Sequence, residues 1–383
     1  MLRGVTPAPH IAVIGAGAFG GWSALWLRRA GARVTLVDAW GAGNSRSSSG
    51  DDTRVIRAVY GPSSTYVAWV ARALELWREH ETRWQRPLLA RTGALWMFTG
   101  DDGYARESAP LLARHGMSLE ELAPDEALRR WPQFALDDVR MAWYEHDAGY
   151  LRARFACACV CEAFVAEGGT YIEAQAKPGR VARGAMGSVA LANGDAIEAD
   201  AYVFACGPWL GSLFPRICGP CVRSTRQEVF YFGTPAGDAR FSEAQCPVWM
   251  HVAADGVTYG IPGNDGRGMK IADDRHGPKF DPSTGSRIVS GKGIKWARSA
   301  IAARFPSLAG APLTESRVCQ YENSPDGHLI IDRHPAARNA WIVGGGSGHG
   351  YKFGPALGEV VSALVLDDGE PDATYGIART LGG

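Results

Sequence analysis

The N-terminal region opens with a short apolar run that leads into glycines and then into apolar residues at helical spacing. Residues 11–14 predict a buried strand, and the glycine-rich segment Gly15–Gly20 predicts a tight turn. The following helix ends near Gly31, and a second strand over 33–37 ends in Asp38. This order of strand, turn, helix and strand predicts a βαβ unit, the usual beginning of an α/β domain.

The rest of the chain alternates helical and strand-like patterns. An apolar helical periodicity covers about 64–82, and a second one covers about 151–167. An Asn-Gly pair inside "ANGDAIEA" predicts a β-hairpin, and "AYVFACG" predicts a buried strand that ends in glycine. Residues 216–317 are rich in predicted strands. The segment "RNAWIVGGGSGHGYKFGPALGEVVSALVL" then predicts a strand, a glycine-rich turn and a helix.

This distribution predicts two domains of different character. The chain has 383 residues, more than a single hydrophobic core usually serves. Because nucleotide-facing glycine turns are predicted at both ends of the chain, we expect a discontinuous Rossmann-like dinucleotide-binding domain of residues 1–86, 148–215 and 318–383. Residues 87–147 and 216–317 are expected to form an α+β substrate domain with a mainly antiparallel sheet.

The composition and charge of the chain limit which binding partners and which cellular compartment we expect. Apolar residues make up 46% of the chain and the formal net charge is zero, so we expect no nucleic-acid partner. We also expect no membrane span, because no apolar run reaches about 18 residues. The eight cysteines form no regular framework and the N-terminus lacks a signal-peptide layout, so we expect a cytoplasmic protein. Five of the cysteines are interpreted as structural, with no metal site: Cys157, Cys159, Cys161, Cys218 and Cys221.

The glycine turn carries the first sign of chemistry. Gly15 allows a tight turn, Gly17 allows close approach of a pyrophosphate, and Gly20 allows the helix to pack on the strand. Asp38 lies about 20 residues further on, where a carboxylate can accept hydrogen bonds from ribose hydroxyls. We include Phe19, inside the turn, among the expected cofactor contacts. The motif predicts a dinucleotide site and leaves NAD and FAD open.

Three further segments together resemble the monomeric sarcosine oxidase family of flavoenzymes, which includes N-methyltryptophan oxidase, pipecolate oxidase and fructosyl amino acid oxidases. They are "GDDTRVIRAVYG", "RVCQYENSPDGHLIIDRHP" and "GGGSGHGYKFGPALGEV". The resemblance spans nearly the whole chain and implies FAD as the cofactor. It also implies that Cys319 forms a thioether to the 8-methyl carbon of the flavin. Gly346, Gly348 and Gly350 of the third segment are expected to contact the cofactor.

The resemblance implies roles for seven more side chains. Arg57 and Lys352 would bind a substrate carboxylate, and Lys352 would also contact the cofactor. Lys270 would activate dioxygen near flavin N5. Four others would lie at the flavin face or line the substrate site: Arg54, His349, Tyr259 and Tyr321. The alternative interpretation is structural: surface charges for the cations, core or rim positions for the tyrosines, a structural hydrogen bond for the histidine and a packed thiol for Cys319.

Some positions depart from the family pattern. Asp274 stands where sarcosine-type members have a histidine, Ser48-Ser49-Gly50 replaces a usual histidine pair, and Thr258 stands where tyrosine is common. The cofactor and carboxylate positions are kept, whereas the walls facing the amine differ. The side chain, the stereochemistry and the oxidised carbon of the substrate stay open.

We therefore expect a monomeric FAD-dependent oxidase of a secondary amino acid (N-methyl, N-alkyl or cyclic). Its partners would be the amino acid and O2, and its products an imine and H2O2. One alternative is a pathway-specific imino acid oxidase or dehydrogenase of secondary metabolism on the same scaffold. Another is a non-catalytic flavin- or NAD-binding protein.

Overall fold

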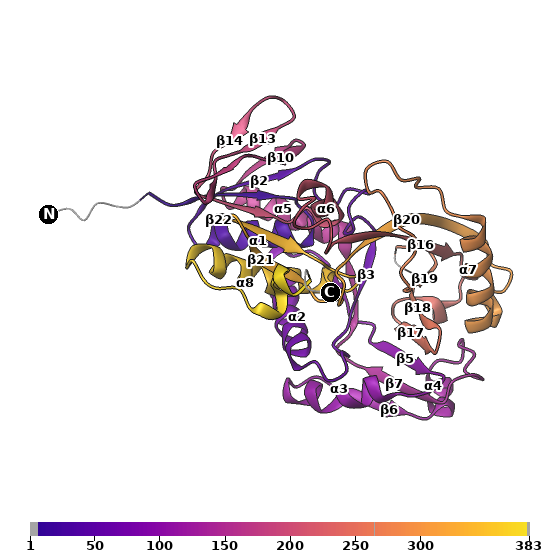
Figure 1. Cartoon of the computed structure of the whole chain (residues 1–383). Helices are drawn as coiled ribbons and strands as arrows, with labels where there is room; N and C mark the ends of the chain where they lie inside the picture. The colour runs from indigo at the N-terminus through magenta and orange to yellow at the C-terminus, as the bar shows by residue number, and fades with distance from the viewer. Residues whose placement is uncertain (1–6, 264, 381–383) are drawn as a thin grey trace.

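The computed structural model describes residues 7–263 and 265–380 and contains two large sheets (Figure 1). The first sheet has six strands in the order β21-β22-β15-β1-β2-β9. All neighbours are parallel except β21 and β22. The strands are β1 (His10–Ile14), β2 (Arg33–Asp38), β9 (Thr170–Glu173), β15 (Ala201–Phe204), β21 (Ile330–His334) and β22 (Ala337–Gly344). The parallel core confirms the predicted Rossmann-like architecture.

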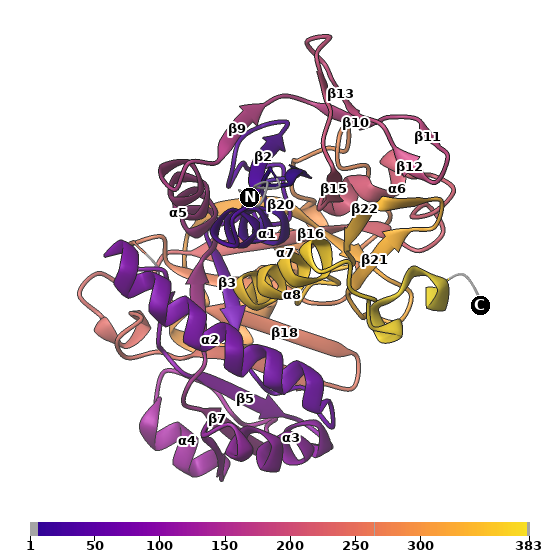
Figure 2. The ribbon, with the colours of Figure 1, turned by 90° about the vertical axis from the view of Figure 1, so that its left-hand side faces the viewer.

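Helices α1 (Ala18–Arg29), α5 (Ala153–Ala166) and α8 (Gly354–Leu366) lie together beside this sheet (Figure 2). The long helix α2 (Ser64–Trp84) packs against α8. Helix α1 is buried around most of its circumference because α5 and α8 flank it. Trp22 of α1 meets Trp77 of α2 edge to face, with ring centroids 5.3 Å apart, and joins the N-terminal unit to the long helix.

Apolar residues on another surface of the six-stranded sheet pack against a small antiparallel sheet of β10 (Ala176–Pro178), β13 (Val189–Leu191) and β14 (Ala196–Ile197). Strands β13 and β14 form the hairpin that the Asn-Gly pair predicts. Gly194 in its turn has φ +94°, a left-handed conformation that favours glycine. A two-stranded ribbon, β11 (Val181–Ala182) and β12 (Ala185–Met186), adjoins it.

The second large sheet has eight strands in the order β20-β16-β19-β18-β17-β5-β7-β6. Only β17 and β5 pair in parallel, so the prediction of a mainly antiparallel sheet is confirmed. The strands are β5 (Ala94–Phe98), β6 (Leu119–Leu122), β7 (Met141–Glu145), β16 (Arg223–Phe232), β17 (Val248–Ala253), β18 (Gly256–Ile261), β19 (Met269–Asp273) and β20 (Leu313–Asn323). Its helices are α3 (Gly103–Arg114), α4 (Pro124–Arg130) and α7 (Gly291–Arg304), with α7 at the outer edge of the view in Figure 1.

Between the two large sheets the chain forms a three-stranded antiparallel sheet, β3 (Thr53–Ile56), β8 (Gly149–Arg152) and β4 (Leu89–Ala90). A short helix, α6 (Leu210–Leu213), follows β15. Cys319 lies in a strand, as the sequence predicts, but the expected domain boundary at 317/318 falls inside this strand, β20. The domain division stays a prediction. Among the described helices, none is long and apolar enough to cross a bilayer.

Candidate active site

The glycine turn between β1 and α1 has a geometry that only glycine satisfies. Gly15 has φ +103°, and a Cβ added there would lie 2.4 Å from the carbonyl oxygen of Ala205. A Cβ on Gly20 would lie 1.8 Å from the carbonyl oxygen of Gly15. Helix α1 therefore starts directly against the strands. Its N-cap residue, Gly17, has no side chain to cap it, and the Ala18 amide donates to Ser49 Oγ at 3.2 Å. Its first turn presents a partial positive charge, which suits a phosphate.

Asp38 lies at the end of β2, beside this turn. Its carboxylate accepts hydrogen bonds from the backbone amides of Ala16 (2.8 Å) and Trp40 (2.9 Å). Burial raises the pKa of Asp38, while these amide hydrogen bonds lower it. The carboxylate is thus held at the carboxyl edge of the sheet, where parallel α/β sheets bind their ligands.

A cavity runs from this turn to the C-terminal glycine loop. Five glycines of the two turns line it, namely Gly15, Gly17, Gly346, Gly348 and Gly350, whereas Gly20 does not. Phe19, Asp38, Arg54 and Tyr321 line it as well. Gly348 has φ +79°, and a Cβ there would lie 2.7 Å from the Tyr321 ring. A Cβ on Gly350 would lie 2.7 Å from the Phe19 ring. The loop therefore packs closely against both rings.

Three buried polar atoms on residues lining the cavity have no hydrogen-bond partner within the described chain: Ser48 Oγ, Gln320 Oε1 and Glu322 Oε2. Buried polar groups are normally hydrogen-bonded, so these atoms indicate a polar ligand. Together with the glycine turn and Asp38, they fit a long cofactor that carries phosphates and hydroxyl groups. The residues present therefore fit FAD.

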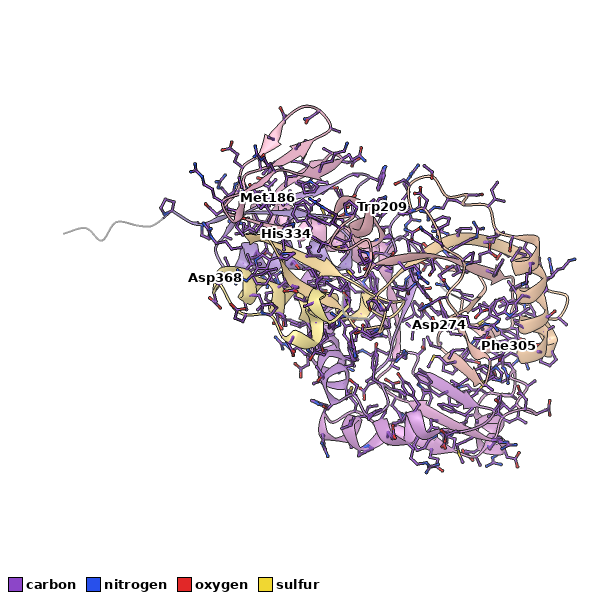
Figure 3. The ribbon with its side chains drawn as sticks, viewed as in Figure 1. Met186, Trp209, Asp274, Phe305, His334 and Asp368 are labelled. Carbon is purple, nitrogen blue, oxygen red and sulfur yellow. The ribbon has the colours of Figure 1, made fainter. Side chains whose placement is uncertain are left out.

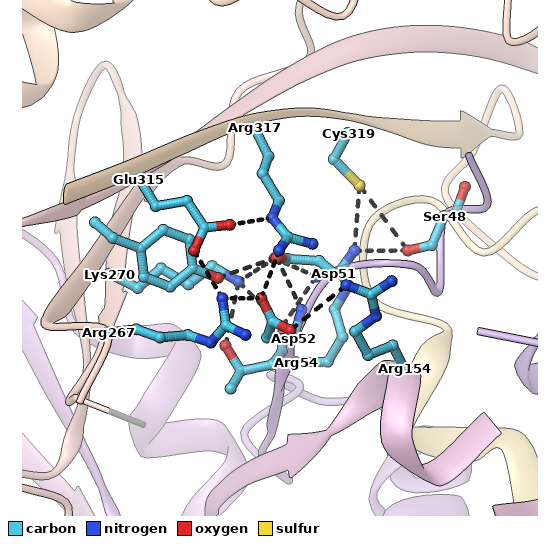
Figure 4. A network of polar contacts seen from close by, with 12 residues as sticks. Ser48, Asp51, Asp52, Arg54, Arg154, Arg267, Lys270, Glu315, Arg317 and Cys319 are labelled. Carbon is cyan, nitrogen blue, oxygen red and sulfur yellow. Dashed lines mark hydrogen bonds and ion pairs between the residues drawn. The ribbon is translucent and has the colours of Figure 1, made fainter. Parts of the chain in front are cut away.

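Cys319 lies beside a guanidinium group (Figure 4). Arg54 Nη2 is 3.2 Å from Cys319 Sγ and donates to the backbone oxygen of Ser48 at 2.6 Å. Arg54 Nη1 binds the carboxylate of Asp51 at 2.8 Å. These contacts fix the guanidinium beside the sulfur.

Lys270 is buried in the same cluster and does not pair with Asp273 or Asp274, as an exposed lysine there would. Its ammonium forms an ion pair with Asp51 and donates to the Thr53 backbone oxygen at 3.0 Å. Burial lowers the pKa of Lys270, the Asp51 carboxylate raises it, and Arg54 lowers it further. The pKa of Lys270 is therefore below its ordinary value.

A second lysine, Lys352, is also buried. Lys352 Nζ donates to Tyr60 Oη and to the His349 backbone oxygen, both at 2.7 Å. His349 Nε2 lies 2.9 Å from the Gly327 carbonyl oxygen, which only accepts, so Nε2 carries the proton. His349 Nδ1 therefore accepts from Tyr60 Oη at 3.0 Å. The chain of donors runs from Lys352 through Tyr60 to a neutral His349.

The pKa values of His349 and Lys352 agree with this pattern, in which His349 is neutral. Burial, followed by the charge of Lys352, lowers the pKa of His349 to about 3. Burial, followed by the charge of Arg57, lowers the pKa of Lys352 well below its usual range. An anion placed beside Lys352 and Arg57 would relieve the repulsion between them.

Arg57 shares Tyr60 with Lys352. Its guanidinium lies over the Tyr60 ring (4.6 Å to the centroid) and over the Trp96 ring (5.2 Å). Arg57 Nη1 also donates to the Val59 backbone oxygen at 2.5 Å. Two aromatic rings thus fix a planar group whose remaining N–H donors suit a carboxylate.

Asp274 adds one carboxylate to these cations. It accepts from Tyr321 Oη at 2.9 Å, and Tyr259 contacts Tyr321 in turn. Burial raises the pKa of Asp274. The hydrogen bond from Tyr321 lowers this pKa, as do the charges of Arg57 and other neighbouring cations. Figure 3 labels Asp274 in the part of the molecule built on the eight-stranded sheet. The buried Glu145 is a second acid whose charge acts on both Arg57 and Lys352, so the substrate side combines two cations with two acids.

Sequence reasoning missed Asp51, Tyr60, Gln320 and Glu322 as site residues. Asp51 and Tyr60 lie inside the "GDDTRVIRAVYG" segment, and Gln320 and Glu322 flank Tyr321 in "CQYEN". Their position inside these motifs was the one sign in the sequence that they belong to the site. Their partners come from other elements of the fold, so their roles could not be read locally.

Comparison with known proteins agrees with this geometry. The model of the family described as "FAD dependent oxidoreductase" matches residues 10–364, and the chain belongs to this family. A monomeric sarcosine oxidase from Bacillus sp. (strain B-0618) is 29% identical over 93% of this chain and 92% of the relative. An N-methyl-L-tryptophan oxidase from Salmonella heidelberg (strain SL476) is 26% identical over 92% of this chain and 94% of the relative.

Among solved structures, an L-proline dehydrogenase from P. horikoshii has the same fold, with a TM-score of 0.83 at 19% identity over 98% of both chains. The resemblance to the monomeric sarcosine oxidase family is thereby confirmed. The protein is a flavin-dependent oxidoreductase of the amine and amino acid oxidase type.

Proposed function

We propose that this protein is an FAD-dependent oxidase of a secondary amino acid, which forms an imine and reduces O2 to H2O2. The observation that carries the proposal is the pair of buried cations, Arg57 and Lys352, which share Tyr60. Tyr351, the residue before Lys352, lines the cavity that fits FAD. The relatives named for sarcosine and N-methyl-L-tryptophan support an N-alkylated amino acid as the substrate.

In this proposal the substrate carboxylate binds between Arg57 and Lys352. The arginine supplies a planar fork of donors, and the lysine supplies a compact charge whose burial is offset by the bound anion. Asp274 attracts the substrate amine, because a carboxylate beside the two cations complements a zwitterion. Asp274 in its ionised form is also able to accept a proton from the ammonium, which leaves the amine neutral for oxidation.

FAD would accept a hydride equivalent from a carbon next to the amine nitrogen and pass two electrons to dioxygen. The imine then hydrolyses in water. The protein's own contribution is placement of the amine and electrostatic support. Lys270, fixed by Asp51 and Thr53, would stabilise negative charge that develops on dioxygen.

Cys319 is proposed to hold the flavin covalently, with its sulfur fixed beside the Arg54 guanidinium. Acid precipitation of the purified protein tests this directly. We expect the yellow colour to stay with the pellet in the parent and to move to the supernatant for Cys319→Ala. Cys157→Ala is the matched control, because Cys157 is another buried free thiol near the cavity, and its colour should stay in the pellet. Colour lost from the parent pellet would contradict covalent attachment.

The substrate class is tested by anaerobic mixing with N-methyl, cyclic and glycated amino acids while the flavin absorbance is followed. We expect bleaching by a secondary amino acid and none by carboxylic acids that lack nitrogen. Peroxide should then form when air is admitted. Bleaching without peroxide would favour a dehydrogenase. No bleaching by any amine would contradict the proposal.

A further inference from the structure

Two alternate residues of β20, Gln320 and Glu322, carry buried oxygens that are left without partners. Gln320 is fully buried and Glu322 is 7% exposed. Gln320 Nε2 donates to the Arg46 backbone oxygen, but its Oε1 accepts from nothing in the described chain. Glu322 Oε1 accepts from the Gly346 amide at 3.2 Å, while its Oε2 has no partner there.

The two side chains line one cavity from one strand. Alternate residues of a strand project to the same side, about 6.6 Å apart along it. Both residues line the cavity that fits FAD. Their free acceptors therefore face a common ligand.

The surroundings of Glu322 keep other side chains away from its free oxygen. A Cβ added to Gly207 or to Gly344 would lie 3.5 Å from Oε2. A Cβ on Gly346 would lie 3.2 Å from Oε1. Of these glycines, Gly207 and Gly346 line the cavity, so no side chain from these two positions stands between the carboxylate and a ligand there.

A purely structural role explains Glu322 poorly. Binding a single backbone amide needs only one neutral oxygen, whereas Glu322 buries a second oxygen that costs free energy when unpaired. Burial raises the pKa of Glu322 to about 7, and the Gly346 amide lowers it only in part. A hydrogen-bond donor on the ligand would remove this penalty.

We propose that Gln320 and Glu322 form a pair of hydrogen-bond acceptors for the flavin half of FAD. The donors available there are the ribityl hydroxyls and the imide N–H. The flavin half is assigned because Glu322 binds the amide of Gly346 in the C-terminal glycine loop, whereas Asp38 lies at the other glycine turn of the cavity. The proposal rests on FAD binding in this cavity and is independent of which amine is oxidised.

The test uses Cys319→Ala protein, in which FAD is free to exchange, and measures the FAD dissociation constant by quenching of flavin fluorescence. Adding Glu322→Gln should weaken binding at least tenfold, about 1.4 kcal/mol, and should shift the visible absorption of the bound flavin. A glutamine amide cannot accept at both ends, so either the Gly346 amide or the FAD donor loses its partner.

Asn323→Ala is the matched control. Asn323 is the next residue of β20, is also buried and also has an unpartnered side-chain oxygen, but it does not line the cavity. We expect its dissociation constant to stay within twofold of the Cys319→Ala parent. Unchanged affinity and an unchanged spectrum in Glu322→Gln would overturn the proposal.

Two further measurements separate a lost contact with the flavin half from a loss of stability or a contact elsewhere on FAD. If Glu322→Gln lowers the thermal midpoint of the FAD-free protein, Gln320→Met takes its place, with the same tenfold loss expected. Riboflavin, which lacks the phosphates and adenosine, should show the same ratio between variant and parent. A normal ratio with riboflavin would overturn the assignment to the flavin half. Absence of FAD binding by Cys319→Ala itself would overturn the cofactor proposal as well.

Discussion

Lys270 and Asp51 form a buried ion pair although 219 residues separate them in the chain. The same Asp51 carboxylate binds Arg54 and accepts from Tyr231 Oη at 3.0 Å. One acid therefore orients two cations: the lysine proposed to face dioxygen and the arginine beside the Cys319 sulfur. The neighbouring Asp52 binds Arg267 and Arg317 at 3.2 and 3.1 Å, so its charge is already matched.

Replacing Lys270 by methionine should slow reoxidation of the flavin by dioxygen. A preorganised charge of this kind typically contributes about 10²–10³-fold in rate. Flavin reduction by substrate under anaerobic conditions should change much less, because the carboxylate site is separate. Stopped-flow absorbance of the two half-reactions measures this. Lys292→Met, at an exposed position, is the control. Equal slowing of both half-reactions would contradict an oxygen-specific role.

Asp51→Asn should destabilise the protein, because it leaves the buried charges of Lys270 and Arg54 without their anion. Breaking a buried pair in this way costs about 3–5 kcal/mol. Chemical denaturation followed by flavin fluorescence would measure the loss. The exposed Asp195→Asn variant should stay within about 0.5 kcal/mol of the parent. A parent-like stability for Asp51→Asn would show that the cations find other partners.

Lys352→Met should raise KM for a secondary amino acid by at least about tenfold, since a charged hydrogen bond contributes about 1.5–3 kcal/mol. Oxidation of an amine that lacks the carboxylate should be affected far less. Steady-state peroxide assays with both substrates provide the comparison. A similar loss for the two substrates would indicate that Lys352 acts on the flavin or on folding instead.

Asp274→Asn should weaken binding of zwitterionic amino acids and leave binding of propionate, which has no amine, unchanged or tighter. The reason is that the variant removes an acid whose charge acts on Arg57 and Lys352 and which is able to attract the amine. Spectral titration of the oxidised flavin gives both affinities. If propionate and the amino acid weaken together, Asp274 serves the position of Tyr321 and not the amine.

Protein stability should fall as pH drops from about 6.5 toward 3, in part because of His349. Its pKa is near 3 in the folded protein against an ordinary value of 6.5, so the unfolded chain binds an extra proton between these values. One such group contributes a slope of up to about 1.4 kcal/mol per pH unit. Thermal midpoints over this range should flatten for His349→Gln relative to the parent. An identical slope would mean that His349 ionises normally.

Local patterns predicted the parts of the fold that are local. The βαβ unit, the Asn-Gly hairpin and the strand around Cys319 follow from periodicity and turn residues within short segments. The parallel pairing of β17 with β5 could not be predicted in this way, because it joins strands about 150 residues apart. The resemblance to a family supplied the candidate site residues, and Lys270 and Cys319 both lie in the cluster around Arg54.

The charge arrangement around these residues was beyond the reach of the sequence. Asp274 reads as an exposed loop acid until Tyr321 is seen to bind it, and the direction of donation from Lys352 through Tyr60 depends on the Gly327 carbonyl. Such relationships are set by tertiary packing. These tertiary contacts determine which of the groups are charged.

Gly346, Gly348 and Gly350 lie far along the chain from the turn at Gly15, yet both segments line one cavity. During synthesis, the turn is made long before this glycine loop. Between these two events the nascent chain holds only one wall of the cavity. Flavin capture, and any bond to Cys319, must wait until the chain has been translated past residue 350.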